Sequence, residues 1–146
     1  MQLPRTILVA TDFSDCAERA LDYAVALAGV LRAKIYLLNV IGVPSLGLPE
    51  LGVALTTTMM ESTVRNHHAE LDRIAGRQPG ANIEVMLRTG DARDVTVDVA
   101  RDVGADLIVM GTHGRRGVRR ALIGSIAEGV LRSAPCPVLT IREQKS

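Results

Sequence analysis

Aromatic residues are nearly absent from this chain of 146 residues, which contains no Trp, two Tyr and one Phe. Proteins that hold single-stranded nucleic acid usually stack several bases on aromatic rings, so a binding platform of that class is disfavoured. The net charge is only +1, whereas a domain that binds duplex DNA is normally basic. The composition therefore argues against nucleic acid as a partner.

Long apolar runs and cysteines are scarce too. No run reaches the roughly 18 residues that a membrane helix requires, and the N-terminal segment lacks the layout of a signal peptide. The two cysteines, Cys16 and Cys136, form no CxxC pair and no Cys/His spacing suited to zinc. Two thiols without a secretory signal predict a cytoplasmic protein. A redox role for Cys136, between two prolines, is the weaker alternative because nothing nearby would activate its thiol.

Hydrophobic residues make up 47% of the chain and charged residues 23%, which is typical of one globular domain spanning residues 1–146. Unbroken apolar runs predict strands that are buried on both faces. Such runs occupy residues 6–10, 35–41, 106–111 and 138–141, and the run at 83–87 contains the polar Glu84, which indicates a strand at a sheet edge. Helical spacing of apolar residues separates them, at 14–31 with Ser14 as the N-cap, at 55–76, at 91–104 and at 123–131.

Two connecting segments need separate treatment. Residues 42–53 are rich in Gly, Pro and apolar side chains and predict a loop. Between Gly90 and Gly104, Val95, Val97 and Val99 alternate as in a strand, but the length of the segment and the glycine at its end favour a helix. Five strands interleaved with four helices predict a parallel sheet with helices on both faces.

Ligands of such sheets bind beyond the carboxyl ends of the strands, where the strand order reverses. The first predicted strand leads into a segment containing Asp12, and the fourth leads into a glycine-rich segment, 111–117. If these two strands are neighbours, Asp12 and the glycine-rich segment face each other across one crevice.

The glycine-rich segment has the chemistry of a phosphate-binding loop. Glycines between a strand end and a helix start allow backbone N–H groups to approach an anion, and the helix N-terminus adds free donors. The glycines are Gly111, Gly114, Gly117 and Gly124, and four arginines lie nearby at 115, 116, 119 and 120. Three structural alternatives remain open: a glycine turn without a ligand, a solvated arginine face, and a capping box formed by Ser125 and Glu128. The motifs of a P-loop and of a dinucleotide-binding fold are absent.

The pattern Gly111-x2-Gly114-x9-Gly124-Ser125 resembles the nucleotide loop of ATP-binding universal stress proteins, and residues 7–14, 37–40, 104–111 and 124–138 are similar to that family as well. One departure is Asn39, where the family more often has His. The resemblance implies a flavodoxin-like three-layer α/β sandwich with a five-stranded parallel sheet of order 3-2-1-4-5, a bound ATP and a homodimer.

Carried over by position, the resemblance implies that Asp12 contacts the base or ribose side, while the backbone of Val40 reads the adenine edge. Aliphatic side chains such as Val40 and Ile41 would surround the base. Mg²⁺, if bound, would be held mainly by the phosphates. The alternative role for Asp12 is to cap the first helix. The full set of candidate ATP-binding residues is Ala10, Thr11, Asp12, Val40, Gly111, Thr112, His113, Gly114, Arg115, Gly124, Ser125 and Ile126.

The last predicted strand, with Val138, Leu139, Thr140 and Ile141, carries no charge. An apolar strand at a sheet edge invites pairing with its twin across a two-fold axis, so we expect an antiparallel homodimer through this strand.

No residue in the candidate site forms a convincing general base or nucleophile. His113 is the only titratable candidate for that role in its loop, and a single loop histidine is more often solvated than catalytic. The favoured hypothesis is therefore a small stress-response protein that acts as a nucleotide-dependent regulatory dimer, with slow hydrolysis at most. The alternatives are a slow ATPase or adenylating enzyme, and an interaction module of the same fold that binds no nucleotide.

Overall fold

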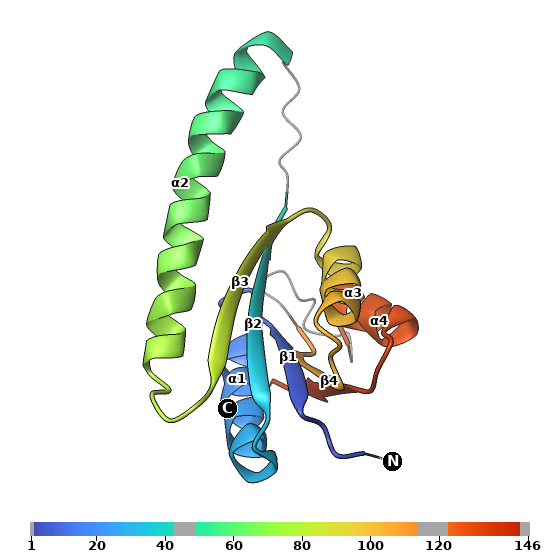
Figure 1. Cartoon of the computed structure of the whole chain (residues 1–146). Helices are drawn as coiled ribbons and strands as arrows, with labels where there is room; N and C mark the ends of the chain where they lie inside the picture. Colours follow the sequence, from blue (N-terminus) through green and yellow to red (C-terminus); the bar gives the residue numbers. More distant parts are fainter. Residues whose placement is uncertain (1, 43–48, 114–122, 144–146) are drawn as a thin grey trace.

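The computed structural model describes residues 2–42, 49–113 and 123–143, with the backbone alone for 49–56. Strands and helices alternate along the whole chain (Figure 1). They are β1 (Thr6–Ala10), α1 (Asp15–Leu31), β2 (Lys34–Ile41), α2 (Pro49–Gly76), β3 (Ile83–Thr89), α3 (Ala92–Asp102), β4 (Leu107–Gly111), α4 (Ser125–Ser133) and β5 (Val138–Ile141).

The strands form one parallel sheet in the order β3-β2-β1-β4-β5. In the centre of the sheet, Ile7 of β1 lies between Ile35 of β2 and Leu107 of β4. The predicted flavodoxin-like order is thereby confirmed, and so is the prediction from Glu84 that β3 is an edge strand. The order also makes β5 the opposite edge.

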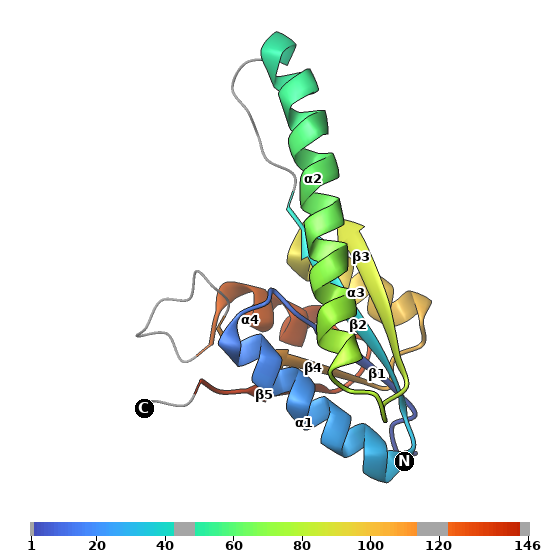
Figure 2. The same cartoon turned by 90° about the vertical axis from the view of Figure 1, so that its left-hand side faces the viewer.

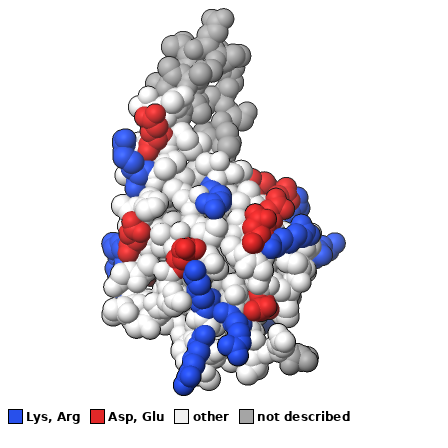
Figure 3. Space-filling model, viewed as in Figure 1, with Lys and Arg blue, Asp and Glu red and all other residues white. Residues whose placement is uncertain are grey.

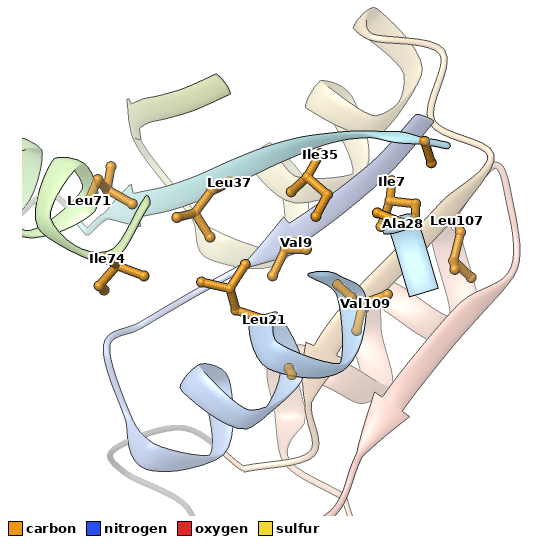
Figure 4. Close-up of a cluster of buried hydrophobic side chains, with 13 residues drawn as sticks. Ile7, Val9, Leu21, Ala28, Ile35, Leu37, Leu71, Ile74, Leu107 and Val109 are labelled. Carbon is orange, nitrogen blue, oxygen red and sulfur yellow. The ribbon is translucent and has the colours of Figure 1, made fainter. Parts of the chain in front are cut away.

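Helices cover both faces because alternate residues of each strand point in opposite directions. Ile7 and Val9 of β1 point toward α1, into a cluster that also contains Leu21 of α1, Leu37 of β2 and Leu71 of α2 (Figure 4). Leu8 points the other way, into a second cluster that α3 and α4 cover. The side chains of Ile7, Leu8 and Val9 are completely buried, which explains why the middle of this strand is an unbroken apolar run.

The first helix is defined at both ends by local hydrogen bonding. The Ser14 side chain accepts a hydrogen bond from the Ala17 N–H at 3.2 Å, as an N-cap does. At the other end Arg32 adopts a left-handed conformation, and its N–H bonds to the Ala28 carbonyl. The predicted N-cap is confirmed.

The second helix begins earlier than predicted. Residues 49–53, expected to lie in a loop, form the start of α2, because a proline at the first helical position is favourable and Pro49 occupies it. The face turned to the sheet carries Leu71 and Ile74, which are buried, whereas Met59 and His68 are exposed. Figures 1 and 2 show that the N-terminal part of α2 extends well beyond the end of the sheet.

The fourth helix begins at Ser125 rather than at residue 123, with Gly124 as the N-cap and no capping hydrogen bond from a side chain. The predicted capping box of Ser125 with Glu128 is therefore wrong. Ala127 and Val130 face the core, whereas Ile126 and Leu131 are 47% and 45% exposed.

None of the helices in the described part of the chain combines the length and apolar character needed to cross a membrane. On the face shown in Figure 3, positive and negative side chains are both spread over the described surface. Ion pairs such as Lys34–Glu84 at 3.8 Å and Arg132–Glu128 at 2.8 Å join some of these exposed charges.

Candidate functional site

The first and fourth strands lie side by side, as the crevice hypothesis required. Val9 pairs with Val109, and the chain leaves β1 after Ala10 and β4 after Gly111. The connection from β1 runs to β2 on one side, and β4 lies on the other, so the strand order reverses here (Figure 1). The carboxyl ends of two neighbouring strands at such a reversal are where α/β sheets bind ligands.

Residues 11–14 form a tight turn between β1 and α1. The Thr11 N–H donates to the Leu38 carbonyl at 2.8 Å, and the Thr11 hydroxyl accepts from the Phe13 N–H at 3.1 Å. Asp12 Oδ1 accepts from the Ser14 N–H at 3.0 Å. Because Ser14 is the N-cap of α1, the alternative in which Asp12 caps this helix is wrong. The turn leaves the half-buried Asp12 at the end of β1.

The buried side-chain amide of Asn39, in β2, holds this turn by a hydrogen bond. The Asn39 side chain is 3% exposed; its Nδ2 donates to the Thr11 carbonyl at 2.8 Å, and its Oδ1 lies 2.8 Å from His67 Nδ1. The His67 ring meets Phe13 edge to face, with the ring centres 5.2 Å apart.

Neither Asn39 nor His67 was predicted as a site residue. Asn39 stood out only as a departure from the family pattern. For His67 the signal was its spacing from Leu71 and Ile74, four and seven residues later, which places all three on one face of a helix.

The end of β4 is closely packed. At Gly111 a Cβ would lie 2.8 Å from Cys16 Sγ, so a larger residue has no room there. Thr112 is buried; its N–H donates to the Ile141 carbonyl at 2.9 Å, and its Oγ1 lies 3.0 Å from His113 Nδ1.

Gly124 joins the start of α4 to the end of β4. Its N–H donates to the Thr112 carbonyl at 2.6 Å. Its φ is −74°, which any residue can adopt, but a Cβ would lie 2.9 Å from the same carbonyl oxygen. Close approach to Thr112, rather than an unusual backbone angle, is therefore what requires glycine at this position.

The N-terminus of α4 presents backbone donors. The amides of the first turn, at Ser125, Ile126 and Ala127, have no partner within the helix, and the glycine N-cap has no side chain to occupy them. Ser125 and Ile126 are exposed. Such a helix end attracts anions, phosphate groups above all.

The backbone of Val40 is directed past the end of β1. Lys34 and Leu38 make their hydrogen bonds toward β1, with Arg5 and Thr11, whereas Ile35 and Ile41 bond on the β3 side, with Asn82 and Gly90. Successive residues of a strand alternate in this respect. Val40 therefore directs its N–H and carbonyl groups toward the side of β2 on which β1 lies. Because the pairing of β1 with β2 ends at Ala10 and Leu38, these groups lie beyond the end of β1.

The remaining predicted positions divide into two groups. Ala10 is half-buried and packs with Val40 against the second core cluster. Gly114 and Arg115 lie outside the described residues, as do Gly117 and the arginines at 116, 119 and 120. Among the residues that the structure does describe, no three His, Cys, Asp or Glu side chains are grouped so as to hold a metal ion.

Comparison with known proteins identifies the family. The model of the universal stress protein family matches residues 4–142. A universal stress protein of Methanocaldococcus jannaschii is 33% identical over 145 residues, which cover 98% of this chain and 85% of the relative. The structure of a universal stress protein from Lactobacillus plantarum superposes with a TM-score of 0.86 at 25% identity, covering 94% of this chain and 97% of that one. A universal stress protein in complex with cAMP matches with a TM-score of 0.66 at 26% identity, covering 96% and 98%. The chain belongs to the universal stress protein family.

Proposed function

We propose that the protein binds ATP at the carboxyl ends of β1 and β4, with the phosphates at the N-terminus of α4. The observation that carries the proposal is the first turn of α4, whose glycine N-cap supplies no capping side chain and which the hydrogen bond from Gly124 to Thr112 holds beside the end of β4. Backbone donors fixed in this way bind phosphate without a lysine. Gly114 and Arg115 are proposed to add further phosphate contacts.

The base and ribose would lie toward β2. The backbone groups of Val40, directed past the end of β1, are suited to the hydrogen-bonding edge of adenine. Ala10 and Thr11 would form the floor, and the Asp12 carboxylate would accept a hydrogen bond from the ribose. With no Trp and three other aromatic residues in the chain, the base would be held by aliphatic side chains and by its edge.

A related protein supports a purine nucleotide as the ligand. The universal stress protein in complex with cAMP has the same fold, and cAMP combines adenine and ribose with one phosphate group. A triphosphate would use more of the donors at α4 and at residues 111–115, which favours ATP. Mg²⁺ would be held mainly by the phosphate oxygens, because it commonly binds through phosphates and water.

The proposed role is regulation rather than catalysis. Asp12 is engaged in its turn through Oδ1, and His113 Nδ1 lies against the Thr112 hydroxyl. Neither is placed as a general base for a water molecule at the phosphates, so hydrolysis is expected to be slow. Occupancy would act through a cytoplasmic homodimer that pairs β5 with its twin, as a sheet edge of apolar residues favours.

Calorimetric titration of the wild-type protein with ATP, ADP, AMP and cAMP, together with a phosphate-release assay, tests this proposal. We expect ATP to bind with a Kd in the micromolar range, more tightly than AMP, and without rapid turnover. Rapid multiple turnover would favour the adenylating or ATPase alternative, and absence of binding by all four nucleotides would favour an interaction module.

A further inference from the structure

The turn that carries Asp12 is connected to α2 through one histidine. His67 of α2 contacts both Asn39 and Phe13. Asn39 bonds to the Thr11 carbonyl, so one contact reaches the residue before Asp12 and the other reaches the residue after it. His67 thus contacts the turn at Phe13 and is linked to it at Thr11 through Asn39.

The hydrogen-bond direction follows from the chemistry of the groups. The Thr11 carbonyl can only accept, so the Asn39 amide must turn its NH₂ toward Thr11 and its Oδ1 toward His67. His67 Nδ1 must therefore carry a proton and donate it to Oδ1. This donor is present in the Nδ1–H neutral ring and in the charged ring alike, so the link does not depend on the protonation of Nε2.

The contact with Phe13 acts at a strained position. Phe13 has a φ of 66°, in the left-handed region that a bulky side chain adopts at a cost and keeps only where its surroundings enforce it. The contacts that enforce it here include the hydrogen bond from its N–H to Thr11 Oγ1, the packing of its ring against His67, and its packing against the first core cluster. Loss of the histidine ring would release one of them.

We propose that His67 is a positioning residue for the nucleotide site: through Asn39 and Phe13 it sets the turn that presents Asp12, and it couples nucleotide occupancy to the placement of α2. The inference rests on the proposed function, because it assumes that the nucleotide contacts Asp12. Coupling of this kind is reciprocal. A ligand that fixes the turn must also stabilise the packing of α2, the helix that extends beyond the sheet (Figure 2), against the sheet.

The variants His67→Phe and His67→Gln test the proposal, with His68→Phe as the matched control. Phe keeps an aromatic ring but removes the donor to Asn39, whereas Gln supplies a donor without a ring. His68 is the adjacent residue, is exposed, and pairs with Asp72 at 3.0 Å on the outer face of the helix. Two quantities are measured for each protein: the Kd for ATP, and amide hydrogen exchange over residues 60–71 with and without ATP.

We expect His67→Phe to weaken ATP binding by about tenfold, within the usual range for coupled sites. His67→Gln should recover part of that loss, and His68→Phe should bind as the wild type does. ATP should slow amide exchange over residues 60–71 in the wild type and in the control, but not in His67→Phe.

A purely structural role for His67 would raise exchange in the ligand-free variant while leaving its response to ATP intact; that result would overturn the inference, as would unchanged affinity in both variants. Failure of the proposed function looks different, since the wild-type protein itself would then bind no ATP. The inference would fall with it in that case.

Discussion

The N–H of Gly124 donates to the carbonyl oxygen of Thr112 at 2.6 Å, so the end of β4 and the start of α4 are held together at the two ends of segment 113–123. The bond fixes where the first turn of α4 lies relative to β4. We propose that this geometry decides where the phosphates bind.

The first prediction concerns Gly124→Ala. Its Cβ would lie 2.9 Å from the Thr112 oxygen, so the bond must shift, and we expect the free energy of unfolding to fall by about 1–3 kcal/mol and ATP binding to weaken. Gly29→Ala is the control, because Gly29 lies in α1 with nothing within 4 Å of an added Cβ. That change should raise the free energy of unfolding by up to about 1 kcal/mol. Urea unfolding of both variants is the measurement, and equal stability would contradict the close contact at Gly124.

Asp12→Asn and Asp12→Ala separate the two roles given to Asp12. Asn retains an oxygen that can accept from the Ser14 N–H, so its free energy of unfolding should stay within about 0.5 kcal/mol of the wild type. Its affinity for ATP should nevertheless fall about tenfold, because a hydrogen bond to a charged group is lost. Ala should lower both stability and affinity. If both variants bind ATP as tightly as the wild type, Asp12 does not contact the nucleotide.

The sheet edge gives a prediction about assembly. Pro137 accepts a hydrogen bond from Ile108 of β4, and Ile141 accepts one from Thr112, just after that strand. By alternation, Val138 and Thr140 direct their backbone groups away from β4. Thr140→Pro removes one of these outward donors without touching the β4 ladder and should convert a dimer to a monomer. Thr140→Val keeps the donor and should remain dimeric. Sedimentation of both at equal concentration is the measurement, and a monomeric wild type would contradict the proposed assembly.

Cys136 gives a pH-dependent prediction. Burial, and to a smaller extent the negative charge of Asp106, raise the pKa of this thiol. A raised pKa means less thiolate at any given pH in the folded protein than in the unfolded chain. Since the thiolate is the reactive form, alkylation of Cys136 in mildly alkaline buffer should be slower in the folded protein than in urea. Peptide mapping by mass spectrometry distinguishes it from the buried Cys16, and equal rates in both conditions would contradict the shift.

The fold could be predicted from the sequence where burial leaves a continuous pattern. The bounds of β1, Thr6–Ala10, and of β5, Val138–Ile141, match the predicted runs. In β1 the three central residues are buried, and a strand covered on both faces needs apolar residues at successive positions. The start of α2 could not be predicted this way. Gly, Pro and apolar residues at 42–53 are typical of a loop, but Pro49 begins a helix.

The sequence predicted where the chain turns at the candidate site, but not the side-chain contacts that hold those turns. Glycine spacing indicated the end of β4 and the start of α4, and Asp12 marked the end of β1. The bond between His67 and Asn39 joins residues 28 positions apart and depends on how α2 seats on the sheet. No local pattern encodes such a pairing.

Calorimetric titration of ATP into Ser125→Asp, with Ser125→Ala and the wild type in parallel, tests whether the phosphates bind at the N-terminus of α4. Ser125 is the first residue of α4 and is exposed. A carboxylate there interacts favourably with the helix dipole, so the free energy of unfolding should hold steady or rise by about 0.3–1 kcal/mol. The same charge would repel the phosphates, so ATP binding should be lost in Ser125→Asp but largely kept in Ser125→Ala. A stable Ser125→Asp protein that binds ATP as tightly as the wild type would contradict the placement of the phosphates at α4.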